Sequence, residues 1–265
     1  MQAAALPGGD SDTGRQSSGE KMLAVLLALG QLGQNDGRGE VRLADLVELT
    51  GHPRPTVHRL LAQLKQAGFV EQEVSGPYRL GPKILLLAAQ CLGGHDVRRI
   101  ANPLMQEFCE RFGHTLHLGI RDGVEVAYID KVNPAHGMQI GSTIGQRRPL
   151  PVTALGKALL AHASPSLVEE VGRVGWPHRT NNTLPDLPAL QRALAEVRAA
   201  GFAIDNEESD LGIRCAAAPI LNHVGTAVAA ISVTTLVSQV SRRDLDRLGR
   251  ELVLVAGEIT RRLGG

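Results

Sequence analysis

Apolar residues near the start of the chain recur at the spacing of amphipathic helices. A first stripe, at positions i, i+3, i+4 and i+7, consists of Met22, Val25, Leu26 and Leu29. This spacing places the four side chains on one face of a helix, so we predict a helix from about Lys21. Residues 33–39, rich in Gly, Asn and Asp, interrupt the pattern. A second short helix is predicted after them, with an apolar face formed by Leu43, Leu46 and Val47.

A third helix is predicted to start near Arg54. Its apolar stripe consists of Val57, Leu60, Leu61 and Leu64. Gly51 and Pro53 separate it from the second helix, because glycine favours a helix end and proline bars continuation. Two helices joined by such a short turn are typical of a helix-turn-helix. Residues 69–81 then form two strand-like runs around a Ser-Gly-Pro turn, which predicts the β-hairpin of a winged helix-turn-helix.

The polar face of the third helix indicates DNA binding. At about 100° per residue, Pro55, Arg59, Ala62 and Gln66 lie opposite the apolar stripe. Short residues allow close approach to a major groove, and an arginine can reach a phosphate or a guanine. The predicted DNA-binding residues are Arg42, Arg54, Pro55, Thr56, His58, Arg59, Gln63 and Arg79. Small helical modules with a hairpin also mediate protein–protein contacts, and basic residues on a helix often just face solvent, so that alternative stays open.

A connecting helix is predicted over residues 83–96. Its stripe of Ile84, Leu87, Ala88 and Cys91 is too narrow to be buried by the small head, residues 21–82, alone. We expect it to pair with the same helix of a second subunit, giving a homodimer with two heads for two DNA half-sites. The alternative is that the helix packs on its own wing.

The remaining residues, 97–265, are predicted to form an α+β domain. A helix ending at Gly113 is followed by strand patterns on both sides of Asp122-Gly123, the strongest hairpin signal in the chain. Helices alternate with further strands, and the last helix begins at Ser241. The predicted elements after Gly113 are strands at 115–121, 124–132, 202–206, 214–220 and 227–235, and helices at 152–162, 166–173 and 187–200.

Composition excludes several classes of protein. The chain has 43% hydrophobic and 21% charged residues and a net charge of +1, so any DNA binding must come from a local patch. No apolar run reaches the length of a membrane span, and residues 1–20 are interpreted as a disordered lead-in rather than a secretory signal. Cys91, Cys109 and Cys215 fit neither a disulfide framework nor a zinc motif, which favours a reducing cytoplasm.

Several segments resemble one family of proteins. The run Arg54-Pro55-Thr56-Val57-His58-Arg59-Leu60-Leu61, with Gly68-Phe69-Val70 and Tyr78-Arg79-Leu80-Gly81, resembles the N-terminal domain of IclR-type bacterial transcription regulators. Arg54-Pro55 replaces the family's usual Lys-Ser pair, so the operator sequence of relatives cannot be transferred. Residues 151–161 and 201–220 resemble the GAF-like effector-binding domain of the same family, and the likeness covers nearly the whole chain after residue 20.

The resemblance implies a pocket for a small-molecule effector in the second domain. It assigns to this pocket Ile140, Gly141, Leu150, Leu155, Gly156, Asp205, Ile213, Cys215, Ser232 and Thr234. Backbone N–H groups where the helix near Leu155 begins favour a carboxylate, whereas Asp205 disfavours one, so the charge of the ligand stays open. We expect a small organic acid or an aromatic metabolite, bound by a homodimer or a dimer of dimers.

Enzymatic chemistry is not predicted. Cys215 is followed by alanines and its nearest histidine in the sequence is His223, so we interpret it as a small buried thiol. His114 and His117 lie three apart on a strand, where they point to opposite faces, so a zinc site there would need distant partners. The chain has no P-loop, Rossmann or HExxH motif, and no cofactor is expected. Two hypotheses remain: a ligand-controlled transcription regulator, and a metabolite-binding or hydrolytic protein whose N-terminal helices serve only for assembly.

Overall fold

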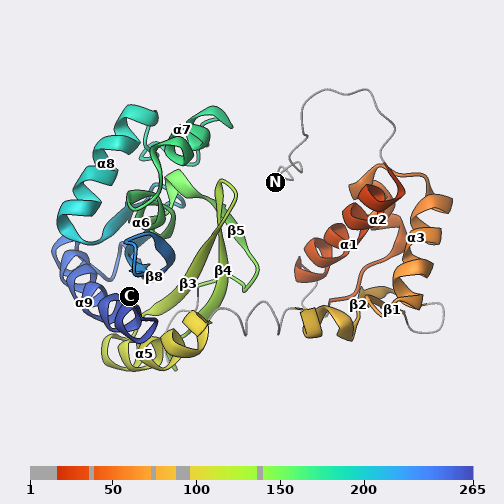
Figure 1. The fold of residues 1–265 in the computed structure, drawn as a ribbon, viewed down its shortest axis with the longest axis horizontal. Coiled ribbons are helices and arrows are strands. Elements are labelled where there is room, and N and C mark those ends of the chain that lie inside the picture. The colour runs from red at the N-terminus through yellow and green to blue at the C-terminus, as the bar shows by residue number, and fades with distance from the viewer. Residues whose placement is uncertain (1–16, 36–38, 73–75, 88–95, 136–139, 265) are drawn as a thin grey trace. The chain divides into compact units, whose positions relative to one another are not determined.

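The structure, a computed structural model, describes residues 17–35, 39–72, 76–87, 96–135 and 140–264 (Figure 1). It consists of two compact units, Met1–Cys91 and Leu92–Gly265. The first helix begins at Ser18, so residues 18–20, which we expected in a disordered lead-in, are helical. Within the predicted connector, residues 83–87 belong to a helical turn at 82–87, whereas Ala88 and Cys91 lie outside the described residues.

The first unit has the predicted order of three helices and a hairpin. Gly51 ends the second helix in the left-handed conformation, with φ of 65°, and its N–H donates to the carbonyl of Val47 at 3.0 Å. Pro53 and Pro55 flank the start of the third helix, where a missing N–H costs no hydrogen bond. The elements are α1 (Ser18–Asn35), α2 (Leu43–Thr50), α3 (Arg54–Gln66), β1 (Val70–Gln72) and β2 (Tyr78–Leu80).

The core of the first unit joins the predicted stripes of its helices. Val25, Leu29, Leu46, Leu60 and Leu61 are at most 1% exposed and pack in one cluster. The hairpin is tied to the chain before α2, because Val41 and Tyr78 exchange two backbone hydrogen bonds of 2.8 Å. The leucines of α3 therefore cannot turn outward without opening this core, and the orientation of its polar face is fixed.

The second unit is built on a six-stranded antiparallel sheet in the order β5-β4-β3-β8-β7-β6. Each predicted strand is present within one or two residues of its expected ends, and a short edge strand, β5, was not predicted. The strands are β3 (Thr115–Asp122), β4 (Glu125–Val132), β5 (Arg147–Pro149), β6 (Ala203–Asn206), β7 (Ile213–Leu221) and β8 (Ala227–Leu236).

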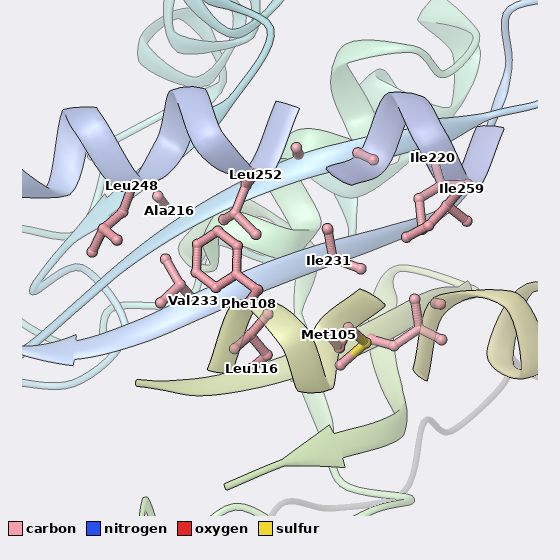
Figure 2. Close-up of a cluster of buried hydrophobic side chains, with 14 of the residues drawn as sticks. Met105, Phe108, Leu116, Ala216, Ile220, Ile231, Val233, Leu248, Leu252 and Ile259 are labelled. Atoms are coloured by element: carbon pink, nitrogen blue, oxygen red, sulfur yellow. The ribbon is translucent and has the colours of Figure 1, made fainter. Parts of the chain in front are cut away.

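Helices cover both faces of this sheet. The main apolar core lies between α5, α9 and one face, where Met105, Phe108, Leu252 and Ile259 contact residues such as Ile231 (Figure 2). A second cluster, centred on α6 and α8, lies against the opposite face. The helices are α5 (Asp96–Phe112), α6 (Ala154–Ala161), α7 (Pro165–Arg173), α8 (Leu187–Ala200) and α9 (Arg242–Arg262).

The helix predicted at 152–162 differs from the prediction. Leu150–Val152 form a 3₁₀ turn, and α6 begins only at Ala154. Thr153 is extended, with φ of −115° and ψ of 149°, and its Oγ1 accepts the N–H of Gly156 at 3.0 Å. A threonine in this position caps a helix, so the polar side chain sets the start of α6.

Gly156 allows α6 to approach the preceding 3₁₀ turn. A Cβ atom at this position would lie 2.1 Å from the carbonyl oxygen of Leu150. We expect Gly156→Ala to lower the free energy of unfolding of the second unit by about 1–3 kcal/mol, because backbone must move to admit the methyl group. Calorimetry of the full chain measures this change.

Gly257 provides the matched control. It lies on the exposed side of α9, and a Cβ there meets no atom within 4 Å. Gly257→Ala should stabilise the helix by about 0.5–1 kcal/mol, because alanine has the higher helix propensity. Equal effects of the two substitutions would contradict the close-approach argument.

Candidate functional site

The third helix of the first unit presents its polar residues to solvent. Arg54, Pro55, His58, Arg59 and Gln63 are exposed. Thr56 is half-buried, and the four apolar residues of the stripe are buried beneath this face. The resulting surface combines guanidinium, imidazole and amide donors with two short residues at the start of the helix. These donors can pair with base edges or phosphates in a major groove.

The two predicted arginines outside α3 have different surroundings. Arg42 is exposed directly before α2, and its backbone N–H donates to the carboxylate of Asp45 at 3.2 Å. Arg79 lies on β2, where its Nε is 3.2 Å from the carboxylate of Glu71. Both of these side chains are nearly half exposed, so the pair is screened by solvent and can exchange for another anion.

The second unit contains a cavity of about 370 Å³ on the sheet face that carries α6. Its wall is apolar at Ala154 and Leu155 of α6 and at Ile213 and Leu236. Eight of the ten residues assigned to the effector pocket line this cavity: Ile140, Gly141, Leu155, Asp205, Ile213, Cys215, Ser232 and Thr234.

Leu150 and Gly156 do not line the cavity. Leu150 is fully buried in the apolar cluster of α6 and α8, where its side chain contributes to packing. The backbone of Leu150 lies against Gly156. The family resemblance assigned both to the pocket, whereas the turn into α6 directs Leu150 into the core.

Further lining residues were missed by the sequence analysis. His117 and Tyr128 come from strands β3 and β4, and Arg148 comes from the edge strand β5. Asp210 follows β6 in a loop. The period of a strand could have indicated His117, because Leu116 and Leu118 on either side of it face the core. The missed residues are His117, Tyr128, Ser142, Gln146, Arg148, Thr153, Ala154, Ser209, Asp210 and Leu236.

Strand register aligns the polar groups on the cavity floor. Asp205 on β6 is paired with Cys215 on β7, which is paired with Thr234 on β8. Ser232, two residues before Thr234, is paired with His117 of β3. Since residues two apart on a strand share a face, these side chains form one continuous polar patch on the sheet.

His117 connects this patch to the segment above the cavity. Its Nδ1 is 3.2 Å from Oγ1 of Thr234, and its Nε2 is 2.6 Å from Oγ of Ser142. Burial, together with the positive charge of Lys131, lowers the pKa of His117 to about 3. The imidazole is therefore neutral, with one nitrogen donating and the other accepting a hydrogen bond.

Lys131 holds the same segment through its backbone. The ammonium group donates to the carbonyl oxygens of Ile140 at 2.6 Å and Ser142 at 2.8 Å. Ile140, Gly141 and Ser142 all line the cavity. Two strands, β3 and β4, thus supply side chains that fix a cap over it.

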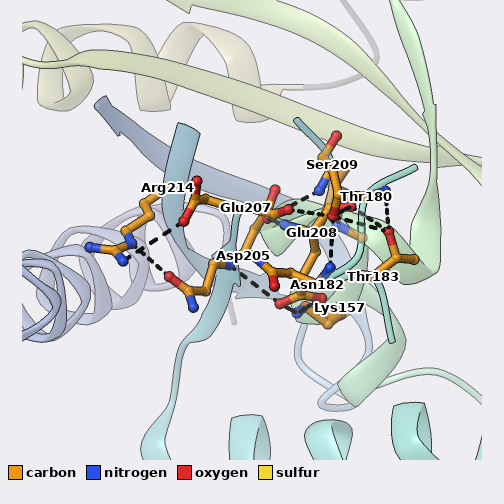
Figure 3. Close-up of polar contacts among 12 residues, drawn as sticks. Lys157, Thr180, Asn182, Thr183, Asp205, Glu207, Glu208, Ser209 and Arg214 are labelled. Carbon is orange, nitrogen blue, oxygen red and sulfur yellow. Dashed lines mark hydrogen bonds and ion pairs between the residues drawn. The ribbon is translucent and has the colours of Figure 1, made fainter. Parts of the chain in front are cut away.

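Asp205 anchors the loop at the other side of the cavity. Its Oδ1 accepts the N–H groups of Glu208 at 2.8 Å and Ser209 at 3.3 Å (Figure 3). Glu207 adopts a positive φ of 60°, and Thr180 and Thr183 donate to the carbonyls of this loop. Burial of the Asp205 side chain is the main cause that raises its pKa to about 7, so its protonated form is populated near neutral pH.

A buried ion pair lies beneath this loop. The ammonium of Lys157 on α6 is 2.6 Å from both carboxylate oxygens of Glu208, and both residues are less than 10% exposed. Removing one partner of such a pair leaves an uncompensated buried charge, at a cost of about 3–5 kcal/mol. Lys157 therefore has a structural role, and it lies outside the cavity lining.

The chemistry of the cavity suits binding better than covalent catalysis. Burial raises the pKa of the Cys215 thiol, whose Sγ lies 3.5 Å from Oγ1 of Thr234, so the nucleophilic thiolate is disfavoured. In the described part of the chain, no group of three or more His, Cys, Asp or Glu residues is arranged to hold a metal ion. None of the described helices is long and apolar enough to cross a membrane.

The raised pKa of Asp205 predicts that stability depends on pH. An unfolded aspartate has a pKa of about 3.9, so the folded state holds one extra proton between about pH 4 and 7. The contribution of Asp205 to stability is present below pH 4 and is lost as the pH rises through 7. Relative to that of Asp205→Asn, the free energy of unfolding of the wild type should fall by up to about 1.4 kcal/mol per pH unit from pH 5 to 7. Above pH 8 the difference should become constant.

Calorimetry of both chains across this pH range tests the prediction. Asp246→Asn, a change of a carboxylate on the surface of α9, is the control and should follow the wild type. Parallel curves for the wild type and Asp205→Asn would contradict a protonated Asp205 in the folded state.

Comparisons with known proteins support the same two-part architecture. Residues 20–74 match the family model for the IclR helix-turn-helix domain, and residues 89–261 match that for the bacterial transcriptional regulator IclR C-terminal domain. The HTH-type transcriptional regulator XynR of Escherichia coli is 35% identical over 233 residues, which cover 87% of this chain and 92% of XynR. The transcriptional repressor IclR of Escherichia coli is 31% identical over 234 residues, 87% of this chain and 85% of that protein.

Solved structures of related proteins have the same fold. An IclR transcriptional regulator from Alicyclobacillus acidocaldarius superposes with a TM-score of 0.80 at 27% identity and covers 92% of this chain and 98% of its own. The Thermotoga maritima IclR superposes with a TM-score of 0.73 at 28% identity, over 93% of this chain and 98% of its own. Both family models and these relatives show that the chain belongs to the IclR family of bacterial DNA-binding transcription regulators.

Proposed function

We propose that this protein is a ligand-responsive, sequence-specific transcription regulator of a metabolic operon, and that it is not an enzyme. The observation that carries the proposal is the exposed polar face of α3 opposite a fully buried leucine stripe. Such a face meets the requirements of a recognition helix, while the cavity of the second unit supplies a place for an effector. Because such a regulator acts on the chromosome, the proposal places the protein in the cytoplasm.

The effector in this proposal is a small organic acid or an aromatic metabolite. A volume of about 370 Å³ lies at the small end of the range for ligand pockets. Apolar walls at Ala154 and Leu155 face a floor of hydroxyl, thiol and carboxyl groups, which suits a compact ligand with a polar end. Repression or activation depends on the position of the operator relative to the promoter, and either output is compatible with the proposed mechanism.

The alternative, a hydrolytic or metabolite-binding protein, has less support. A Cys-dependent hydrolase requires a base beside its thiol, and the side chain at 3.5 Å from Cys215 is a threonine hydroxyl. His117 contacts that threonine, and burial lowers the pKa of its imidazole to about 3, which makes it too weak a base to deprotonate a thiol. The thiol is therefore not activated in this arrangement.

DNA binding through α3 is tested by removing the central arginine. Arg59→Ala should weaken retention of a DNA fragment from upstream of the gene or of a neighbouring operon by about 1–3 kcal/mol, if the guanidinium reads a base. Electrophoretic mobility shift with specific and scrambled fragments measures the loss. A similar loss on every sequence would instead identify a phosphate contact.

Arg247→Ala is the matched control for that experiment. Arg247 lies on α9, with a side chain 65% exposed, and its removal should not change retention. If the wild type retains no fragment in a saturable and salt-sensitive way, the regulator proposal is wrong.

We also propose that the protein acts as a homodimer or a dimer of dimers. Leu85, Leu86 and Leu87, at the start of the predicted connector, are 72%, 65% and 50% exposed, and Leu23 and Leu27 of α1 are more than 60% exposed. Apolar side chains in such numbers on a small unit favour a protein interface. Paired heads would then bind two half-sites.

Leu87→Glu tests this assembly. We expect sedimentation to show a smaller assembly than for the wild type. Each buried leucine contributes about 1.5–3 kcal/mol to association, and a carboxylate opposes burial. Leu254→Glu, at a residue 70% exposed on α9, should leave the mass unchanged. An unchanged mass for Leu87→Glu would favour the alternative in which the connector packs on its own wing.

A further inference from the structure

Arg148 differs from the other residues that line the cavity. Among the lining residues in the described part of the chain, it is the one lysine or arginine, and its side chain is 23% exposed. The imidazole of His117 is neutral and contributes no positive charge. Among its described lining, the cavity therefore has a single cationic group, which projects from the edge strand β5.

Asp210 neutralises this arginine. A terminal nitrogen of Arg148 lies 3.3 Å from Oδ2 of Asp210, which also accepts the hydroxyl of Ser209 at 3.0 Å. The other oxygen of Asp210 lies 3.1 Å from Arg179, which does not line the cavity. One carboxylate thus serves two guanidinium groups, and it keeps Arg179 and Ser209 as partners if Arg148 turns away.

The contact between Arg148 and Asp210 joins the two edges of the sheet. β5 and β6 are the outermost strands in the order β5-β4-β3-β8-β7-β6, and Asp210 follows β6 by four residues. Because the lining residues come from both edge strands and from the strands between them, the sheet curls around the cavity. The ion pair closes that curl across a side where Gln146 and Ser209 also line the cavity.

We propose that Arg148 binds the carboxylate of a small monocarboxylate effector in exchange for Asp210, so that ligand binding releases the contact between the two sheet edges. A planar guanidinium can bind a carboxylate through two short, parallel hydrogen bonds. The pair of Arg148 and Asp210 is partially exposed, and its nitrogen and oxygen lie 3.3 Å apart, so it is weaker than such an arrangement. A ligand with two or more negative charges would meet both Asp205 and Asp210, so a single charge fits better.

The neutral end of the ligand lies on the sheet floor in this arrangement. Ser232, Thr234 and His117 offer hydrogen-bond donors and acceptors there. The sheet edges therefore have two states, one joined by the contact between Arg148 and Asp210 and one separated by the ligand. A ligand that binds only the second state shifts the equilibrium toward it. The inference rests on the proposed effector role of the cavity.

Calorimetric titration of the full chain with matched acids and amides tests this exchange. The probes are butyrate, lactate, benzoate and salicylate, each with its primary amide. We expect at least one acid to bind the wild type more tightly than its amide does. Arg148→Gln should lower the affinity for that acid by about tenfold or more and abolish the preference for the acid over its amide. Arg148→Lys should lower the affinity less.

Asp210→Asn gives the opposite result if the exchange is correct. Removing the competing carboxylate frees Arg148, so the acid should bind several-fold more tightly. A merely structural ion pair predicts that Arg148→Gln and Asp210→Asn weaken binding together. Arg179→Gln is the control, since Arg179 contacts Asp210 without lining the cavity, and it should keep the preference for the acid.

The outcomes separate this inference from the proposed function. An acid preference that persists in Arg148→Gln, or tighter binding of amides than acids to the wild type, overturns the exchange but leaves the cavity as a ligand site. Weaker acid binding by Asp210→Asn also overturns it. If none of the probes binds the wild type, the monocarboxylate assignment is wrong, while DNA retention and its dependence on Arg59 are unaffected.

Discussion

The alternation of side chains along strands β7 and β8 is the constraint on which the second unit depends. Ala216, Ala218 and Ile220 face α9 and the main core, so the residues between them face the other way. The same period on β8 buries Ile231 and Val233 and leaves Ser232 and Thr234 on the opposite face. A shift of one residue would place hydroxyl groups in the core, so stability and the cavity floor are fixed by the same register.

Polar groups on that floor are tolerated because the fully buried polar atoms have hydrogen-bond partners. Within the described residues, no buried side-chain nitrogen or oxygen lacks a hydrogen bond. Asp205 accepts two backbone N–H groups, and Thr234 lies between His117 and Cys215. Burial acts on Asp205, His117 and Cys215 in one direction, because it disfavours the charged form of each. The floor is consequently more neutral than its residue types suggest, and the charge of Arg148 at the edge has few competitors.

Local patterns were sufficient to predict the first unit. α3 is found at Arg54–Gln66 with the expected stripe buried, since apolar spacing and a Gly-Pro turn define it without distant contacts. The cavity could not be predicted from local patterns alone. Residues such as Leu155 and Cys215 came from the family resemblance, whereas Arg148 and Asp210 are brought together only by the curl of the sheet, which joins edges 62 positions apart in sequence. Neither of these two residues belongs to a local motif that would indicate a ligand site.

Two neighbouring residues of strand β4, Asp130 and Lys131, contact different parts of the second unit. Lys131 contacts the cavity cap, and Asp130 contacts the helix α5. Lys131 holds the carbonyls of Ile140 and Ser142, while the carboxylate of its neighbour Asp130 accepts the amide of Asn102 at 2.7 Å and lies 3.5 Å from Arg98. Asn102 and Arg98 belong to α5, the helix that follows the connector. In the proposed mechanism, a ligand acts on DNA binding only through the difference in its affinity for two states of the protein. If the two states differ in the position of the cap, strand β4 must adjust to that difference. The same strand holds the first turns of α5 through Asp130.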